Sequence, residues 1–169
     1  MTEQGTMLAE IEASMTDVEG KYLTFTLADE EYGISIIKVK EIIGMMPVTM
    51  VPQTPPHVKG VINLRGKVIP VIDLRNRFQL EERDYTDRTC IIVVEVTGIT
   101  RTIPIGIVVD SVSEVLNIHA AEIEPAPSFG ISMDTNYILG MAKSANTVKI
   151  LLDIDAVLSA DEMAALTVS

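Results

Sequence analysis

The sequence predicts a mainly β protein built from two similar small β-barrels that pack together. Two observations lead to this prediction. First, short runs rich in β-branched residues alternate with Gly, Pro, Asn and Asp, which is typical of barrels and sandwiches rather than of parallel sheets with crossover helices. Second, the pattern of the first half of the chain recurs in the second half. A repeat of small β units implies two similar barrels with a junction between them.

The internal repeat appears at two fixed spacings. Gly33 recurs 73 residues later as Gly106. After an apparent insertion of seven residues the spacing becomes 80 residues, and Asp73 then corresponds to Asp153. The other matched pairs are Val39 with Val112, Glu41 with Glu114, Pro52 with Pro125, Gly60 with Gly140, Val68 with Val148, and Ile72 with Leu152.

The first predicted elements form a hairpin. Residues 21–27 alternate and are rich in β-branched and aromatic types, the acidic run 29–31 turns the chain, and residues 32–36 return it. Gly66 is expected to turn a second, tight hairpin, because glycine adopts positive φ at little cost. The later strand-like runs are 61–65, 67–74, 89–96, 103–109, 137–143 and 147–154.

Helix is sparse in the predicted fold. Residues 1–19 carry few large apolar side chains and are expected to form a mobile acidic tail. Ser159 and Glu162 form a capping box before 163–166, which predicts a short C-terminal helix. The expected organisation is a domain of 20–169 with approximate halves 20–88 and 89–158, whose C-terminal segment packs back on the first half.

Composition narrows the classes of function. Thirteen basic against 24 acidic residues give a net charge of −11, which disfavours nonspecific nucleic-acid binding. No apolar run approaches the ~20 residues that span a bilayer, so we expect a cytoplasmic protein without membrane insertion. Cys90 is a single cysteine in an apolar run and is expected to be a buried, inert thiol. Residues 38–77 are locally basic, which suits either an acidic partner or phosphate, or simply a solvated barrel surface.

The residues that carry chemistry favour a binding module over an enzyme. The two histidines, His57 and His119, have no metal-ligand spacing, and no phosphate-binding glycine loop is present, so no catalytic residue, metal or cofactor is expected. Arg65 beside the Gly66 turn can pair with a carboxylate, and Glu41 is a candidate partner. The valines and isoleucines at positions 36, 39, 43, 68, 108 and 115 are candidates to line an apolar groove, or alternatively belong to the core.

Several motifs resemble those of the CheW family of bacterial chemotaxis coupling proteins. The resemblance extends from about residue 20 to residue 168. The chain departs from the family pattern at 97–102, where the hairpin is longer. The motifs are Glu30–Ile42, Pro52–Pro55, Lys59–Gly66, Val68–Arg75 and Gly106–Leu116.

The resemblance implies two five-stranded, Src-homology-like barrels in a non-enzymatic adaptor. Such an adaptor links the cytoplasmic tips of chemoreceptors (methyl-accepting chemotaxis proteins) to the regulatory domain of the histidine kinase CheA, at membrane-associated receptor clusters. By resemblance, the receptor-binding residues are Glu41, Arg65, Gly106, Val108 and Val115. The kinase-binding residues are Ile36, Val39 and Gly60.

Physical reasoning adds two expectations to this resemblance. A receptor tip is a helical hairpin, and helices dock by burying an apolar stripe, so we expect a groove at the barrel junction with Glu41 and Arg65 at its rim. The kinase is expected to contact another face around residues 36–60. The alternatives are a related coupling module or a detached kinase-regulatory domain of the same fold, and remotely an enzyme. A length of 169 residues leaves no room for a receiver or ATP-binding domain beside these barrels.

Overall fold

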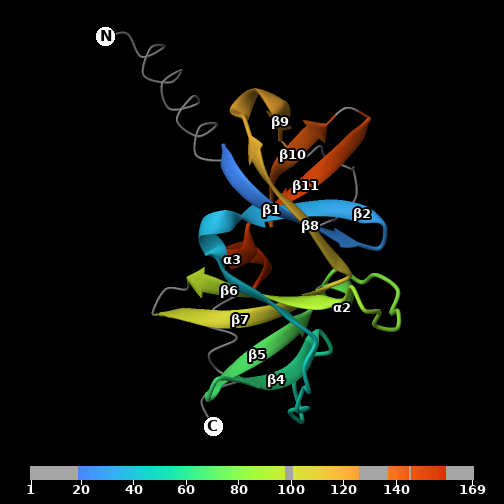
Figure 1. The fold of residues 1–169 in the computed structure, drawn as a ribbon, viewed down its shortest axis with the longest axis vertical. Coiled ribbons are helices and arrows are strands. Elements are labelled where there is room, and N and C mark those ends of the chain that lie inside the picture. The colour runs from blue at the N-terminus through green and yellow to red at the C-terminus, as the bar shows by residue number, and fades with distance from the viewer. Residues whose placement is uncertain (1–18, 98–100, 126–136, 145, 159–169) are drawn as a thin grey trace.

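The computed structural model describes residues 19–97, 101–125, 137–144 and 146–158. These residues form two β-sheets, one above the other in Figure 1, with α3 between them. One sheet has six strands in the order β8-β1-β2-β11-β10-β9, and the other has five in the order β3-β6-β7-β5-β4. The elements are β1 (Gly20–Leu27), β2 (Glu30–Ser35), η1 (Ile36–Lys38), β3 (Val39–Gly44), β4 (Val58–Leu64), β5 (Lys67–Asp73), α2 (Leu74–Arg77), β6 (Cys90–Thr97), β7 (Thr102–Val109), β8 (Ser111–Ile118), η2 (Ala120–Glu122), β9 (Ile123–Glu124), β10 (Ile138–Ser144), β11 (Thr147–Leu152) and α3 (Ile154–Val157).

The mainly β, two-unit architecture predicted from the sequence is confirmed, with two differences. The sheet that contains β1 has six strands rather than the expected five, because the two-residue strand β9 pairs with β10. Pairing of the named strands leaves both described sheets open rather than closed into barrels. In the five-stranded sheet, however, Thr49 exchanges two backbone hydrogen bonds with Val61 of β4, at 2.8 and 2.9 Å, which draws the chain beyond β3 to the opposite edge.

The repeat is visible in the strand register. Gly33 of β2 lies opposite Leu151 of β11 in a parallel pair, and Gly106 of β7 lies opposite Val71 of β5 in the equivalent parallel pair. A register shift occurs at Gly60 in β4 and at the corresponding glycine of β10. Asp73 caps α2 and Asp153 caps α3, each accepting a hydrogen bond from the backbone N–H two residues on. The two sheets therefore repeat one plan.

The sheets do not follow the expected halves 20–88 and 89–158. Strands β1 and β2 join β8–β11 in the six-stranded sheet, whereas β3–β5 join β6 and β7 in the other. The chain leaves the first sheet through η1 and returns to it at Asp110, the single residue between β7 and β8. At both connections the next strand continues into the opposite sheet. Each sheet thus contains strands from both copies of the repeat.

Three strands were absent from the sequence prediction. These are β3, β8 and the short β9. The first two follow the two connections that lead from one sheet to the other, η1 before β3 and Asp110 before β8, which we call the crossings. Strand β3 alternates half-buried and exposed residues, and β8 is mostly half-buried or exposed, so neither contains the apolar run that marked the other strands. The expected hairpin turn at Gly66 is confirmed, with Arg65 and Gly66 at φ of 51° and 88°.

The largest buried cluster contains residues of both sheets and of α3. Leu23 and Ile34 of the six-stranded sheet share it with Ile92 of the other sheet, and Leu158 joins it from the end of α3. Each sheet also has a smaller cluster of its own, one around Ile62 and Val93 and the other around Tyr22 and Ile118. The centre of the junction is therefore packed with side chains rather than open as the expected groove.

Two expectations fall on residues that the structure does not describe. The predicted helix after Ser159 lies outside the described residues, and so does the predicted tail except for Glu19. The β6–β7 hairpin closes with Thr97 opposite Thr102, and residues 98–100 of the longer loop are likewise outside the described ranges.

Gly60 offers a test of the close approach between β4 and the segment around Thr49. Its φ is +148°, and an added Cβ would lie 2.1 Å from the carbonyl oxygen of Thr49. We expect Gly60→Ala to lower the free energy of unfolding by at least ~2 kcal/mol, since strained backbone and a backbone clash add together. The measurement is urea unfolding. The control is Gly44→Ala, where a Cβ meets nothing within 4 Å and the expected change is within about 0.5 kcal/mol; equal losses in the two variants would contradict the assignment.

Candidate protein-interaction site

An exposed ion pair joins the two edges of the five-stranded sheet. Glu41 lies on β3 and Arg65 in the β4–β5 turn, and an Nη2 of Arg65 donates to Oε2 of Glu41. Asn63 holds the turn by accepting a hydrogen bond from the Gly66 N–H at 2.8 Å. The hydrogen bond from Arg65 lowers the pKa of Glu41 below its ordinary value. The pairing that the sequence suggested is thus present, with the Arg65 side chain 69% exposed.

Exposed apolar side chains are chain neighbours of this ion pair. Ile42 follows Glu41 on β3 and is 46% exposed, and Val68, just beyond the hairpin turn, is 64% exposed. Glu41 and Ile42 face opposite sides of β3, because Glu41 lies opposite Val93 of the sheet's own cluster and Ile42 lies opposite Ile92 of the junction cluster. The ion pair and these apolar side chains are therefore neighbours along the chain at the edges of the sheet. We call Glu41, Ile42, Arg65 and Val68 the hairpin-edge surface.

Two of the five predicted receptor-binding residues are buried. Gly106 lies in β7, and an added Cβ would lie 2.8 Å from Cγ2 of Ile91. Val108 is 4% exposed and belongs to the core cluster of the five-stranded sheet. Neither residue therefore adds exposed surface to the Glu41–Arg65 pair, and a side chain at Gly106 would meet Ile91.

Val115 is exposed but lies on a different sheet from the hairpin-edge surface. It is on β8 in the six-stranded sheet, opposite Leu23 of β1. The structure therefore brings Glu41 and Arg65 together and does not gather all five predicted receptor-binding residues at one place.

Of the predicted kinase-binding residues, Ile36 is the first residue of the crossing η1 and Val39 directly follows η1. Both are half-buried against the junction cluster. Between them lies Ile37, which is 83% exposed and which the sequence did not single out. The one sequence feature that indicates an exposed apolar residue here is the pair Ile36-Ile37, because two adjacent side chains do not both face the core. Gly60, the third predicted residue, is buried beneath the backbone of Thr49.

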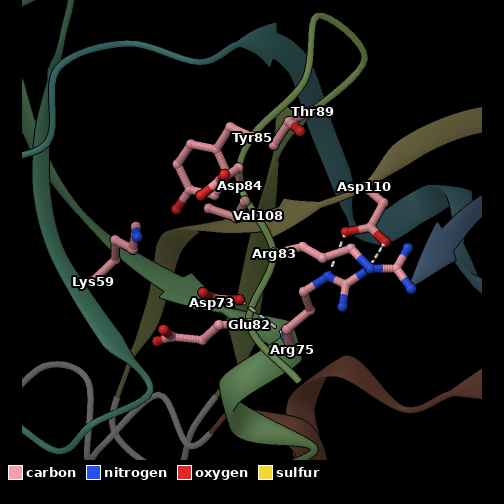
Figure 2. Close-up of a pocket in the computed structure, with 10 residues that line it drawn as sticks. All are labelled: Lys59, Asp73, Arg75, Glu82, Arg83, Asp84, Tyr85, Thr89, Val108 and Asp110. Atoms are coloured by element: carbon pink, nitrogen blue, oxygen red, sulfur yellow. Dashed lines mark hydrogen bonds and ion pairs between the residues drawn. The ribbon is translucent and has the colours of Figure 1, made fainter. Parts of the chain in front are cut away.

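A polar cleft of about 620 Å³ opens beside the end of β5 (Figure 2). On its floor, Arg75 binds Asp110 through two hydrogen bonds, one of them from Nε at 2.7 Å. At the opposite wall the Lys59 ammonium lies 4.7 Å from the centre of the Tyr85 ring. The lining residues are Lys59, Asp73, Arg75, Glu82, Arg83, Asp84, Tyr85, Thr89, Val108 and Asp110.

Two of the charged residues in this cleft, Arg75 and Asp110, form an ion pair with each other. Burial alone would raise the pKa of Asp110, but the hydrogen bonds from Arg75 and from the Ala28 N–H outweigh it and lower that pKa. A hydrogen bond with Tyr85 raises the pKa of Lys59. Within the described ranges, no three His, Cys, Asp or Glu side chains are grouped so as to hold a metal ion. Cys90 is half-buried rather than fully buried, and burial raises the pKa of its thiol.

The arrangement defines a duplicated two-sheet β module whose most prominent exposed features suit protein contacts. In keeping with this, a family model for the CheW-like domain matches residues 21–162. The chain belongs to the CheW-like family.

Individual relatives agree with this assignment. The chain is 44% identical to a chemotaxis protein CheW of Klebsiella aerogenes over 144 residues, covering 85% of this chain and 84% of that protein. It is 41% identical to the Bacillus subtilis chemotaxis protein CheW, covering 82% of this chain and 86% of that one. The crystal structure of the scaffolding protein TtCheW from Thermoanaerobacter tengcongensis superposes with a TM-score of 0.73 at 35% identity, covering 86% and 96% of the two chains.

In the part of the chain that the structure describes, no helix has the length and apolar character needed to cross a membrane.

The Arg75–Asp110 pair gives a pH-dependent prediction. Because the folded-state pKa of Asp110 is lowered, its contribution to stability is complete above the unfolded-state pKa of about 3.9 and is lost as the pH falls below that value. Asp110→Asn leaves the buried Arg75 without a counter-charge, and we expect it to cost about 3 kcal/mol of unfolding free energy at pH 7. Urea unfolding across pH 2.5–7 should show this difference shrinking below about pH 4.

The control is Asp29→Asn. Asp29 is an exposed carboxylate 3.7 Å from Arg83, so its replacement should leave stability nearly unchanged throughout that range. A difference between wild type and Asp110→Asn that persists undiminished at the lowest pH would contradict the role given to the Asp110 charge.

Proposed function

We propose that this chain is a non-enzymatic scaffold of bacterial chemotaxis, which couples the cytoplasmic tips of chemoreceptors to the regulatory domain of the histidine kinase CheA. Membership of the CheW-like family supports the proposal, as does the structural similarity to TtCheW, a scaffolding protein. The observation that carries it is the Glu41–Arg65 pair, which joins the edges of the five-stranded sheet and leaves the Arg65 side chain exposed. The protein would act in the cytoplasm at membrane-associated receptor clusters, without a cofactor.

The hairpin-edge surface is the proposed receptor contact. Its ion pair presents both signs of charge at fixed positions, which favours one register of a bound helix over others. Ile42 and Val68 supply apolar surface on which a helix can bury its stripe. Val115 on the other sheet would belong to the same contact only if the receptor also reaches β8.

The surface of η1 and the start of β3 is the proposed kinase contact. Ile37 is the most exposed apolar residue there, and Ile36 and Val39 lie on either side of it. The two proposed contacts are centred on different residues, Ile37 in η1 for the kinase and the Glu41–Arg65 pair for the receptor. Coupling then requires that each partner binds one state of the other more tightly.

The buried candidates act in this proposal through the backbone. Gly60 permits the close contact with Thr49 that curls the five-stranded sheet, and Gly106 permits the packing of β7 against Ile91. Substituting either glycine displaces the strands that carry the proposed contact surfaces. A loss of partner binding in such variants therefore needs no direct contact.

Arg65→Glu tests the proposed receptor contact. The side chain is exposed, so we expect the thermal midpoint to stay within a few degrees of wild type. Capture of the receptor fragment should fall at least tenfold, because the reversed charge at position 65 would repel the receptor group that Arg65 is proposed to attract. The measurement is pulldown of a soluble receptor-tip fragment, with circular dichroism as the check on folding.

Lys143→Glu is the matched control for Arg65→Glu. Lys143 also lies next to a β-hairpin turn, in the other sheet, and pairs with Glu124 at 2.8 Å. Capture by this variant should equal wild type. If Arg65→Glu binds as well as Lys143→Glu, the receptor contact lies elsewhere, although the family assignment stands.

The non-enzymatic part of the proposal is tested with nucleotide and membranes. We expect the purified protein neither to bind nor to hydrolyse ATP, as measured by calorimetry and phosphate release. It should co-sediment with receptor-containing membranes, and the kinase should co-sediment fully only when this protein is present. Hydrolysis that follows the folded protein through purification, or kinase sedimentation independent of it, would refute the adaptor function.

A further inference from the structure

Each crossing between the sheets is fastened to a short helix by an ion pair. At the first crossing, Nζ of Lys38 in η1 lies 2.6 Å from Oδ2 of Asp155 in α3. At the second, the carboxylate of Asp110 binds the guanidinium of Arg75 in α2. Since these crossings exchange strands between the sheets, the two ion pairs lie where the sheets are connected.

The two fastenings join equivalent elements of the repeat, although at the 73-residue spacing Lys38 corresponds to Ser111 and Asp110 to Ile37. Arg75 and Asp155 are 80 residues apart, and each lies two residues after the aspartate that caps its helix. In each fastening the carboxylate also accepts a hydrogen bond from a β-hairpin backbone. Asp110 accepts from the N–H of Ala28 at 2.9 Å, in the β1–β2 turn, and Asp155 accepts from the N–H of Thr97 at 2.7 Å, at the β6–β7 turn.

The charges are reversed between the two fastenings. The crossing residue is the acid at Asp110 and the base at Lys38, and the helix residue has the opposite sign in each case. A reversal that keeps the same three connected parts indicates that the link itself, rather than a particular residue type, is needed at each crossing.

The two fastenings differ in the exposure of their basic group, whereas their carboxylates are equally exposed, at 30% for Asp110 and 29% for Asp155. The Arg75 side chain is 6% exposed, and its Nη1 also donates to the carbonyl of Glu81 at 2.7 Å. Lys38 and Asp155 are 27% and 29% exposed, and one hydrogen bond joins them. Salt screens solvent-accessible pairs much more than buried ones, so the Lys38–Asp155 pair is the weaker link.

We propose that Lys38 and Asp155 form a releasable latch that controls the mobility of η1 and the start of β3, whereas Arg75 and Asp110 form a permanent link. Release of the latch frees the segment that carries Ile36, Ile37 and Val39. Lys38 and Asp155 are therefore positioning residues for a protein partner at this segment, and this consequence rests on the proposed kinase contact.

Amide hydrogen exchange in the full chain tests the latch without any partner. The reporter is the Val39 N–H, which donates to the carbonyl of Ile36 at the end of η1. We expect Lys38→Met to raise its exchange rate at least tenfold while the Ala28 N–H, bound to Asp110, keeps its rate. The control is Lys40→Met, which removes a lysine two residues away that pairs with Glu95 at 3.4 Å, and which should change the Val39 rate less than twofold.

Salt provides a second measurement that needs no variant. In wild type, 1 M NaCl should raise the Val39 rate several-fold and leave the Ala28 rate unchanged, because both groups of the first pair are accessible whereas the guanidinium of the second is buried. The double variant Lys38→Asp with Asp155→Arg copies the polarity of the other fastening and should return the Val39 rate to near wild type. Equal rates in Lys38→Met and Lys40→Met, or an equal rise at Ala28, would overturn the latch.

Binding to the regulatory domain of CheA then separates the latch from the proposed function. Lys38→Met should weaken this binding at least threefold, with the double variant restoring it and the thermal midpoint unchanged. If Val39 exchange rises as expected and binding does not change, the latch is supported and the kinase contact at η1 is overturned. If exchange does not rise, the latch is overturned whatever the binding shows.

Discussion

The exchange of strands between the two sheets is the constraint on which the rest of this structure depends. Strand β3 leaves the sheet that contains β2, and β8 leaves the sheet that contains β7, so each sheet includes strands from both copies of the repeat. Neither copy can then form a complete sheet alone. The largest buried cluster also takes its residues from both sheets and from α3. Folding of the two units is therefore expected to be cooperative, since each supplies strands that the other lacks.

The duplicated plan has kept its backbone and changed its charges. The glycines of the parallel strand pairs and the capping aspartates occupy equivalent places, because a side chain or a missing cap there would disturb the same packing twice. Side chains that neither cap a helix nor permit close packing of the backbone differ between the two copies of the repeat. Lys149 of β11 is buried and paired with Glu31 at 2.9 Å, whereas Ile69 occupies the equivalent position in β5. The two copies therefore differ chemically at an equivalent buried position.

For a scaffold, the separation of contact surfaces from the packed junction has a physical consequence. The hairpin-edge surface and the η1 surface share no residue, although both include residues of β3. They can still influence each other, because β3 carries Glu41 at its centre and begins directly after η1. A shift of β3 would therefore move residues of both surfaces. Coupling of that kind requires only that each partner binds one position of the strand more tightly than another.

The sequence by itself determined the mainly β class, the two-copy plan, the Gly66 turn and the pairing of Arg65 with Glu41. These depend on alternation, turn chemistry and complementary charge, which are local or follow from the repeat. Only the tertiary structure decided which strands share a sheet, because pairing between distant edges has no local signature and β3 and β8 lack an apolar run. It also decided that Gly106 and Val108 are buried, since burial depends on what packs over a strand. The Lys38–Asp155 and Arg75–Asp110 links had no signal in the sequence for a related reason: the repeat aligns Lys38 with Ser111 and Asp110 with Ile37, so no pair of like residues marks the two links.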